Sequence, residues 1–458
     1  MQNKYSPAIR LKLSPQKIVS YAGCAAGAIG LVCLLVLLLF PDQFVNRFIK
    51  PRISRAFTEA YPAYSIHIAG MNYSFLKNRF GFDSVVLSAS DGKFSGNIGP
   101  FSMSGISWLH LLWGGSIRPE NFAGAVVDAQ DIVLNFLQSQ YEMRCRLLRV
   151  SVPDSEIVVD SLKLHPVGDD EQSFAGSKFR KTRFRLVVPH ANAGGFACLN
   201  LLQGKMCRTR IVQIHDAFLD VLVNKDKPGS KATSITLMPN EILFALKEIL
   251  QIDSLSIING RLNYGERFAV GAEPALITFD SMQVLAKGIT KPDGSGAASV
   301  IQAQANFMKA GMLNVFMSIP SASPVFSFQY SGSVSRMDLS ALNSFLETAE
   351  QIRITTGVLQ EATFKINVVS GCASGKVRAV YEDLNFAVID KYTGSAKGFS
   401  DGIASFMANT FKIRGTNVPD KSDSLKIGEV NYMRKRDDPF FGFVWFALRS
   451  GVGDVIGF

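Results

Sequence analysis

The chain is poor in the patterns that catalysis uses. Its 458 residues contain five histidines, none in an HExxH pattern and no two at the i, i+4 spacing of helical metal ligands. No GxSxG nucleophile motif occurs. The segment Gly371–Lys376 superficially resembles a phosphate loop, but its glycine spacing is one residue short and Val377 replaces the required Ser or Thr. We therefore expect no enzyme, no cofactor and no metal site.

Cysteine and nucleic-acid signals are also sparse. Of six cysteines, Cys24 and Cys33 lie in an apolar run, and the others form no CxxC pair. Cys198 and Cys207 are candidates for a disulfide in an oxidising compartment, and two free thiols are an equal alternative. The net charge of +10 comes without a helix-turn-helix, zinc-finger or RNA-binding pattern. We expect no nucleic-acid partner, and the basic charge favours anionic lipid head groups.

Residues 18–40 form an uncharged run of 23 residues that does not recur in the chain. At about 1.5 Å per helical residue, the run is long enough to cross a hydrocarbon core of roughly 30 Å. It exceeds a signal-peptide core of about 7–15 residues and lacks a small-residue cleavage site. We predict a single transmembrane helix at 18–40 and an arm at 1–17, whose shortness favours placing it in the cytoplasm. Four basic residues flank each side, so charge leaves the orientation open.

Residues 42–62 have the spacing of an amphipathic helix, and Pro51 is expected to kink it. Two interpretations stand together. The helix lies on the membrane surface beside the anchor, or it is the first helix of the following domain and packs on its sheet.

Short alternating segments fill residues 63–436 and predict a mainly β domain with one apolar and one polar face. Asp91-Gly92 and Asn259-Gly260 are hairpin signals, because these residues accept positive φ. Helices are expected after Pro239 and after Asp338, a candidate N-cap. We predict a largely antiparallel sheet with a few short amphipathic helices.

Residues 437–458 combine aromatic residues with few charges and predict a C-terminal amphipathic helix. Such a segment packs on its own domain, or it enters a membrane interface or a protein partner. The candidate contact residues are Phe440, Phe441, Phe443, Trp445 and Phe446.

A basic cluster precedes and enters a predicted strand. It is a candidate for contact with lipid phosphate, although a solvated polar face is the better interpretation of such a cluster. Its members are Lys178, Arg180, Lys181, Arg183 and Arg185.

Several stretches resemble the AsmA-like family of bacterial envelope proteins. They are the N-terminal anchor with its helix, residues 252–267 with their strand, turn and Tyr-x-Glu, residues 375–384, and residues 428–434 with the aromatic helix that follows. The resemblance implies an inner-membrane anchor, a cytoplasmic N-terminus and a periplasmic, elongated, curled β-groove (a β-taco). It also implies that the groove holds acyl chains and carries phospholipid toward the outer membrane.

One alternation set in the best-matching stretch supplies candidate groove-lining residues: Leu255, Ile257, Leu262 and Tyr264. The alternative is that these residues pack a closed sandwich core. Three functions therefore stay open: lipid transfer, a structural or assembly subunit of an envelope complex such as a secretion apparatus, and a carbohydrate- or peptidoglycan-binding module. A continuous open apolar groove favours the first, and a closed core with aromatic residues buried against other chains favours the second.

Overall fold

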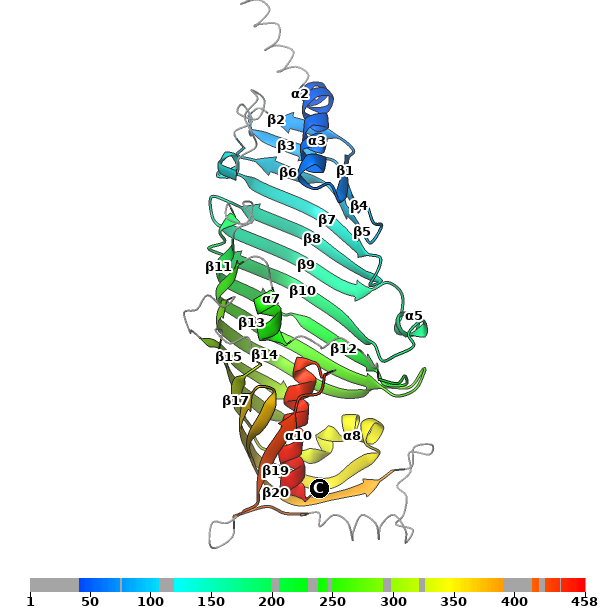
Figure 1. Cartoon of the computed structure of the whole chain (residues 1–458), viewed down its shortest axis with the longest axis vertical. Coiled ribbons are helices and arrows are strands. Elements are labelled where there is room, and N and C mark those ends of the chain that lie inside the picture. The colour runs from blue at the N-terminus through cyan, green and yellow to red at the C-terminus, as the bar shows by residue number, and fades with distance from the viewer. Residues whose placement is uncertain are drawn as a thin grey trace, which may run out of the picture.

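The computed structural model describes residues 41–74, 76–106, 119–198, 206–229, 238–245, 249–290, 298–320, 326–389, 414–419, 425–436 and 438–457. Over these residues the chain is mainly β, with 21 strands in one sheet and a few short helices (Figure 1). The predicted arm at 1–17 and membrane span at 18–40 lie outside them. Within the described part of the chain, no helix is both long and apolar enough to cross a membrane.

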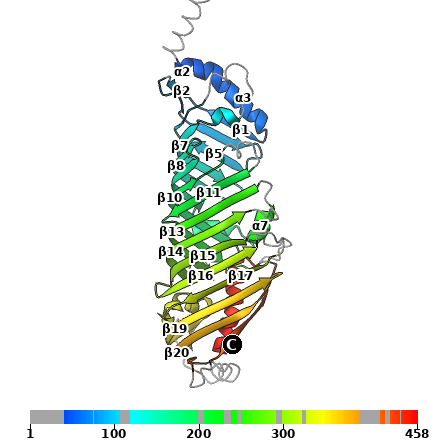
Figure 2. The ribbon, with the colours of Figure 1, turned by 90° about the vertical axis from the view of Figure 1, so that its left-hand side faces the viewer.

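The sheet is elongated, and its strands are stacked obliquely along the long axis (Figure 2). The strands are β1 (Tyr64–Ile68), β2 (Met71–Ser74), β3 (Arg79–Phe82), β4 (Val85–Ala89), β5 (Phe94–Ile98), β6 (Phe101–Ser104), β7 (Val126–Phe136), β8 (Tyr141–Ser151), β9 (Glu156–Pro166), β10 (Thr182–Gly194), β11 (Met206–His215), β12 (Phe218–Asn224), β13 (Ile249–Arg267), β14 (Ala275–Thr290), β15 (Ala298–Phe307), β16 (Gly311–Pro320), β17 (Phe328–Val334), β18 (Met337–Asp338), β19 (Ile352–Val369), β20 (Cys372–Val388) and β21 (Ile427–Met433).

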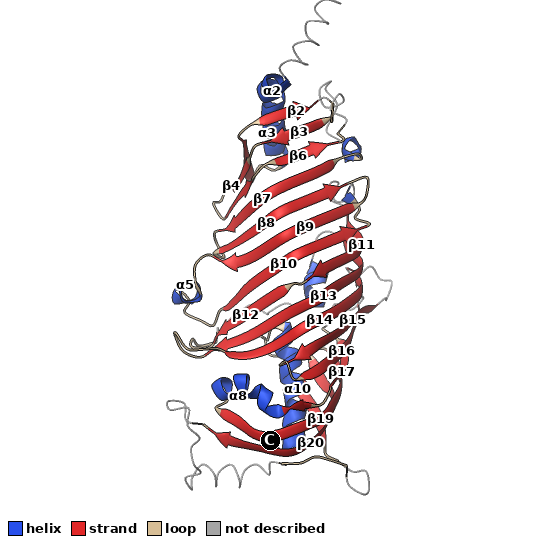
Figure 3. Cartoon of the chain, turned by 180° about the vertical axis from the view of Figure 1, so that it is seen from behind, coloured by secondary structure: helices blue, strands red, loops and turns tan. Residues whose placement is uncertain are grey.

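Helices lie at the ends of this sheet, along its edges and against one of its faces. They are α2 (Pro41–Phe44), the π-helix η1 (Val45–Ile49), α3 (Lys50–Ala60), the 3-10 helix η2 (Pro119–Phe122), α5 (Asp170–Ala175), α7 (Pro239–Ala245), the 3-10 helix η3 (Leu339–Leu342), α8 (Asn343–Ala349) and α10 (Phe440–Ile456). Helices α7 and α10 lie in front of the strands in Figure 1 and behind them in Figure 3. They therefore share one side of the sheet.

The sheet is bent lengthwise. Residues 126–129 of β7 pair with β6, whereas residues 133–136 pair with β5. Between them, Asp131 has a φ of +49°. Ala129, Ile132 and Cys145 nevertheless pack in one cluster. Side chains at 129 and 132 therefore face the same way, and the alternation of the strand restarts at Asp131.

Residues with positive φ recur along the sheet at Ser161, Asp216, Asn259 and Ser281, whose φ values lie between 51° and 56°. The pairing registers place these residues and Asp131 along one line across the strands. We call this line the crease. It divides the sheet into a first wall, which includes β2, β3, β6 and β11, and a second wall, which includes β1, β4, β5 and β12.

The hairpin prediction at Asn259-Gly260 is wrong. These residues lie inside the single strand β13, where the register to β14 shifts on either side of Gly260. Asn accepts positive φ in a strand bend as readily as in a turn, so the dipeptide marks the crease instead of a chain reversal. The Asp91-Gly92 turn is confirmed, since it joins the paired strands β4 and β5 with Gly92 at φ +69°.

The sheet is largely antiparallel, as predicted, but it is mixed, because two of its pairings are parallel. Strands β11 and β12 both run parallel to β13. The chain leaves β12, passes through α7 and starts β13 beside the beginning of β11. A connection that carries the chain back along the sheet produces parallel pairing. Helix α7 follows Pro239 as predicted, and Asp338 caps the turn of η3 by accepting from the Ser340 amide at 2.8 Å.

The N-terminal helical segment packs on the sheet. Val45, Ile49 and Ile53 contact the cluster that contains Met71 and Phe82. Pro51 lies in the first turn of α3, directly after the π-helical turn that widens the helix. Proline has no amide proton to donate, which fits a break in the regular helical ladder at this point. The predicted contact of this segment with a membrane surface stays a proposal.

Candidate functional site: an apolar interior face

Two rows of apolar side chains run across the first wall from one end of the sheet to the other. Directly paired residues in a sheet lie side by side on the same face, so a row can be followed through the registers. Row A is Tyr73, Phe80, Met103, Val127, Val150, Ile157, Ala193, Val212, Leu255, Ala286, Ile301, Met317, Tyr330, Ile366, Gly375 and Val430. Row B is Met71, Phe82, Phe101, Ala129, Leu148, Val159, Ala191, Ile214, Ile257, Val284, Ala303, Val315, Gly332, Phe364, Val377 and Gly428.

The row between them, on the opposite face, has a different composition. Its members are Asn72, Gly81, Ser102, Asp128, Arg149, Val158, Asn192, Gln213, Ser256, Leu285, Gln302, Phe316, Ser331, Lys365, Lys376 and Glu429. Most of these side chains are polar or charged. We call the face that carries rows A and B the interior face.

A third apolar row continues the interior face on the second wall. Row C is Ile66, Leu87, Gly96, Leu134, Met143, Leu164, Leu186, Leu219, Leu262, Phe279, Phe307 and Gly311. All four predicted lining residues therefore lie on this face: Leu255 in row A, Ile257 in row B, Leu262 in row C, and Tyr264 two residues beyond Leu262 in the same strand. The continuity of the rows could not be predicted from the alternation within single strands, because it depends on the registers of all the strands.

The interior face is buried at both ends. At the N-terminal end, η1 and α3 cover Met71 and Phe82. At the C-terminal end, the rows enter a core that contains Tyr330, Ile366 and Val377 and is covered by α10. Between the two ends the residues of all three rows are mostly only partly buried, as at Val212, Leu255 and Ile257. The middle of the face thus keeps apolar side chains in partial contact with solvent.

Helix α10 seats on the sheet through Phe443, Ala447, Gly451 and Val455, which recur every four residues and are buried. The contact is close, because a Cβ on Gly451 would lie 2.6 Å from methyl carbons of Val377 and Val430. The side chains of Asp454 and Ser450 accept the Glu429 and Asn431 amides at 2.8 and 3.3 Å, so α10 also caps the outer edge of β21.

The predicted aromatic contact residues of α10 divide between two surroundings. Phe443 is fully buried against Phe326, Phe328 and Tyr432. Phe440 packs on the same core, and the ring of Phe446 lies 5.7 Å from that of Tyr432. Phe441 and Trp445 are exposed to 76% and 41%. The helix therefore fills its own domain with one side and presents two aromatic rings with the other.

Tyr264 lies next to row C on the second wall and is part of a polar contact. Its hydroxyl donates to Glu266 Oε1 at 2.7 Å, and Lys225 Nζ lies 3.0 Å from the same oxygen. Burial, together with the neighbouring Glu266 carboxylate, raises the pKa of Tyr264, so the phenol stays protonated. Apolar lining thus gives way to polar groups at this edge of the wall.

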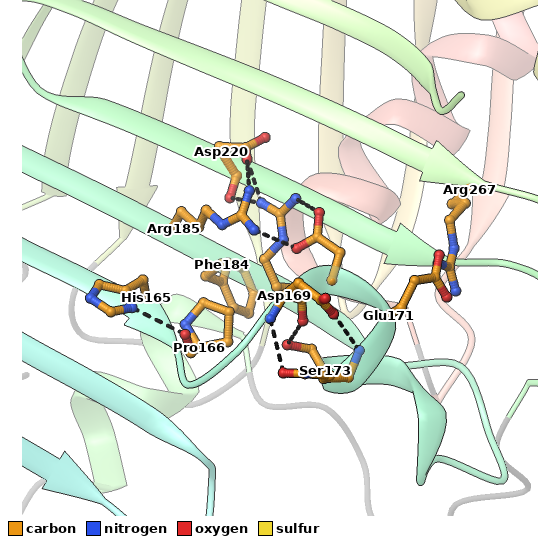
Figure 4. Close-up of polar contacts among 12 residues, drawn as sticks. His165, Pro166, Asp169, Glu171, Ser173, Phe184, Arg185, Asp220 and Arg267 are labelled. Atoms are coloured by element: carbon orange, nitrogen blue, oxygen red, sulfur yellow. Dashed lines mark hydrogen bonds and ion pairs between the residues drawn. The ribbon is translucent and has the colours of Figure 1, made fainter. Parts of the chain in front are cut away.

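The predicted basic cluster lies elsewhere. Arg183 and Arg185 alternate with Leu186 and so point away from row C, to the face that α5 covers (Figure 4). Arg183 is buried between Asp170, at 2.9 Å, and Asp220, and Arg185 also pairs with Asp170 at 2.7 Å. These two arginines therefore have carboxylate partners.

The other members of the basic cluster are nearer to solvent. Lys181 donates to the carbonyl of Ser173 and Arg180 to that of Lys227, whereas Lys178 is exposed. A pocket of about 370 Å³ adjoins the Arg183 pairs and is lined by Asp170, Glu171, Arg183, Asp220 and Arg267 among others.

The described residues contain no group of three or more side chains that would hold a metal ion. Cys198 and Cys207 are both free thiols in the structure, and burial raises the pKa of Cys198. A scan against protein-family models finds no match for this chain, and neither does a comparison with curated proteins.

Proposed function

We propose that this chain is an AsmA-like protein of the bacterial cell envelope, anchored in the inner membrane by residues 18–40 and extending into the periplasm. Its interior face binds phospholipid acyl chains and conducts them toward the outer membrane, without catalysis. The observation that carries this proposal is the continuity of rows A and B across the sheet, with a partly exposed stretch in the middle.

The dimensions of this stretch suit an acyl chain. From β7 through β8, β9, β10, β11 and β13 to β14 there are six steps between neighbouring strands, or about 29 Å at roughly 4.8 Å each. A bilayer core of about 30 Å holds two acyl chains end to end. Each CH₂ that leaves water for this surface contributes about 0.8 kcal/mol.

Adjacent residues of β13 provide a matched test. A photocrosslinking amino acid at Leu255 or at Ile257 is expected to label phospholipid in the intact membrane, whereas the same group at Ser256 points to the opposite face and is expected to label none. Mass spectrometry of the full-length protein purified in detergent is expected to find co-purified phospholipid. Equal labelling at 255, 256 and 257, or no lipid in either experiment, contradicts the proposal.

The second candidate is a structural or assembly subunit of an envelope complex. The closed C-terminal end favours it, because α10 fills the interior face there and presents Phe441 and Trp445 outward. In that case crosslinkers at these two positions label protein, and those at 255 and 257 label nothing.

A further inference from the structure

The side chains that β11 places on the interior face change from apolar to positively charged along the strand. Ile214 and Val212 belong to rows B and A, and the next two residues on the same face are Arg210 and Arg208. Residues two apart in a strand are separated by about 6.6 Å. The strand therefore passes from the crease, through two apolar positions, to two guanidinium groups at the edge of the first wall.

The neighbouring strand β13 repeats this change from apolar to polar side chains, whereas β10 ends in a glycine. On β13, Ile257 and Leu255 are followed on the same face by Asp253 and Gln251, and the Gln251 amide donates to Asp253 at 2.8 Å. On β10, Ala193 is followed by Gly195 just beyond the strand end. The edge of the first wall is thus polar where the middle of the face is apolar. We call it the rim.

The position of the Arg210 side chain depends on Gly195, which has no side chain to occupy the same space. A Cβ on Gly195 would lie 2.3 Å from Arg210 Nε, so the arginine lies across this glycine. Gly195 also has a φ of +67°, which few other residues adopt. Any side chain at position 195 would displace Arg210 from this position.

Arg210 lies opposite Asp253 in the register between β11 and β13, but the two side chains form no ion pair. Among the described residues Arg210 has no ion pair or hydrogen bond, and its side chain is exposed. Arg208 lies 3.9 Å from Asp253, with both side chains close to half exposed. An exposed ion pair at this distance contributes little, so Arg208 is available to a stronger anionic partner.

We propose that Arg208 and Arg210 bind the phosphate of a lipid head group while its acyl chains lie on rows A and B. Guanidinium groups match phosphate oxygens in charge and geometry. With the phosphate at the rim, the acyl chains would start beside the two arginines and continue along rows A and B, across the strands. The proposal rests on the proposed lipid function and adds to it a binding site for the phosphate of the head group.

The test compares two lipids that differ in the phosphate. Fluorescent-chain phosphatidylglycerol and a diacylglycerol with the same fluorescent chain are titrated onto the full-length protein in detergent. We expect the wild-type protein to favour phosphatidylglycerol by about tenfold, equivalent to about 1.4 kcal/mol. In Arg208→Gln/Arg210→Gln, the affinity for phosphatidylglycerol is expected to fall to that for diacylglycerol, which itself stays unchanged.

Arg149→Gln is the matched control, because Arg149 is an exposed arginine of the opposite face. It is expected to bind both lipids as the wild type does. Inorganic phosphate is expected not to compete, since it has no chains to occupy the rows. Equal binding of both lipids by the wild type, an equal loss in the control, or displacement by inorganic phosphate overturns this inference and leaves lipid binding standing. Binding of neither lipid overturns the proposed function itself.

Discussion

Helix α10 determines whether the interior face is closed at its C-terminal end, and two phenylalanines two residues apart test its seating. Phe443 is fully buried and has ring centroids 5.1 Å from Phe326 and 5.7 Å from Tyr432. Phe441 is 76% exposed. Phe443→Ala removes a buried ring and leaves a cavity, which costs about 3–5 kcal/mol. Phe441→Ala removes a mostly solvated ring and is expected to stay within about 0.5 kcal/mol.

Hydrogen exchange of the full-length protein in detergent measures both variants. The amides of Glu429 and Asn431 report on docking directly, because their hydrogen-bond acceptors are Asp454 and Ser450 of α10. In Phe443→Ala, exchange at these amides is expected to accelerate more than a hundredfold, since each 1.4 kcal/mol corresponds to a factor of ten. In Phe441→Ala it is expected to stay near the wild-type rate. Equal exchange in the two variants would refute the docked arrangement.

Two further predictions concern charged contacts. Arg434 pairs with Glu241 at 2.8 Å and, with hydrogen bonding as the main cause, lowers the pKa of Glu241. The stabilisation is therefore complete above the ordinary glutamate pKa and lost as pH falls through the lowered one. Thermal melts between pH 6 and 3, about the window in which carboxylates titrate, measure this loss of stability. Glu241→Gln is expected to remove the part of the loss that the pair causes. An unchanged pH profile would contradict the pairing. Arg183→Met is expected to cost about 3 kcal/mol in chemical denaturation, the low end of the range for a broken buried pair, because the partly buried Asp170 and Asp220 keep only Arg185 as a partner. A loss below about 1 kcal/mol, typical of exposed pairs, would contradict the burial of this contact.

The mainly β class and the short helices could be predicted because they depend on local signals. Alternation identifies a strand wherever one face is apolar. A helix start or a turn depends only on a few neighbouring residues, as at Pro239, Asp338 and Asp91-Gly92. The crease could not be predicted in the same way. Asn259-Gly260 signals positive φ, but whether the chain then reverses or continues depends on whether the following segment pairs with the preceding one or with a different strand.

The sequence also could not show which arginines have carboxylate partners. Arg183 and Arg185 look like a basic cluster because their neighbours in the chain include Lys178 and Lys181. Their carboxylate partners come from α5 and from Asp220 in β12, which the registers bring together. Arg208 and Arg210 form a similar pair of arginines two residues apart in the sequence. Arg210, however, forms no ion pair with a carboxylate in the described part of the chain.

The covered ends limit how a bound lipid would leave the interior face. At the C-terminal end, passage along rows A and B requires α10 to undock, and its buried aromatic contacts oppose that at a cost of several kcal/mol. The Arg449–Glu350 contact between α10 and the end of α8 adds little, because both side chains are substantially exposed. The middle stretch has no such barrier among the described residues, since its apolar side chains are already partly exposed and its rim carries the arginines. A lipid held there would therefore exchange sideways across the rim more readily than along the axis, unless a partner first displaces α10.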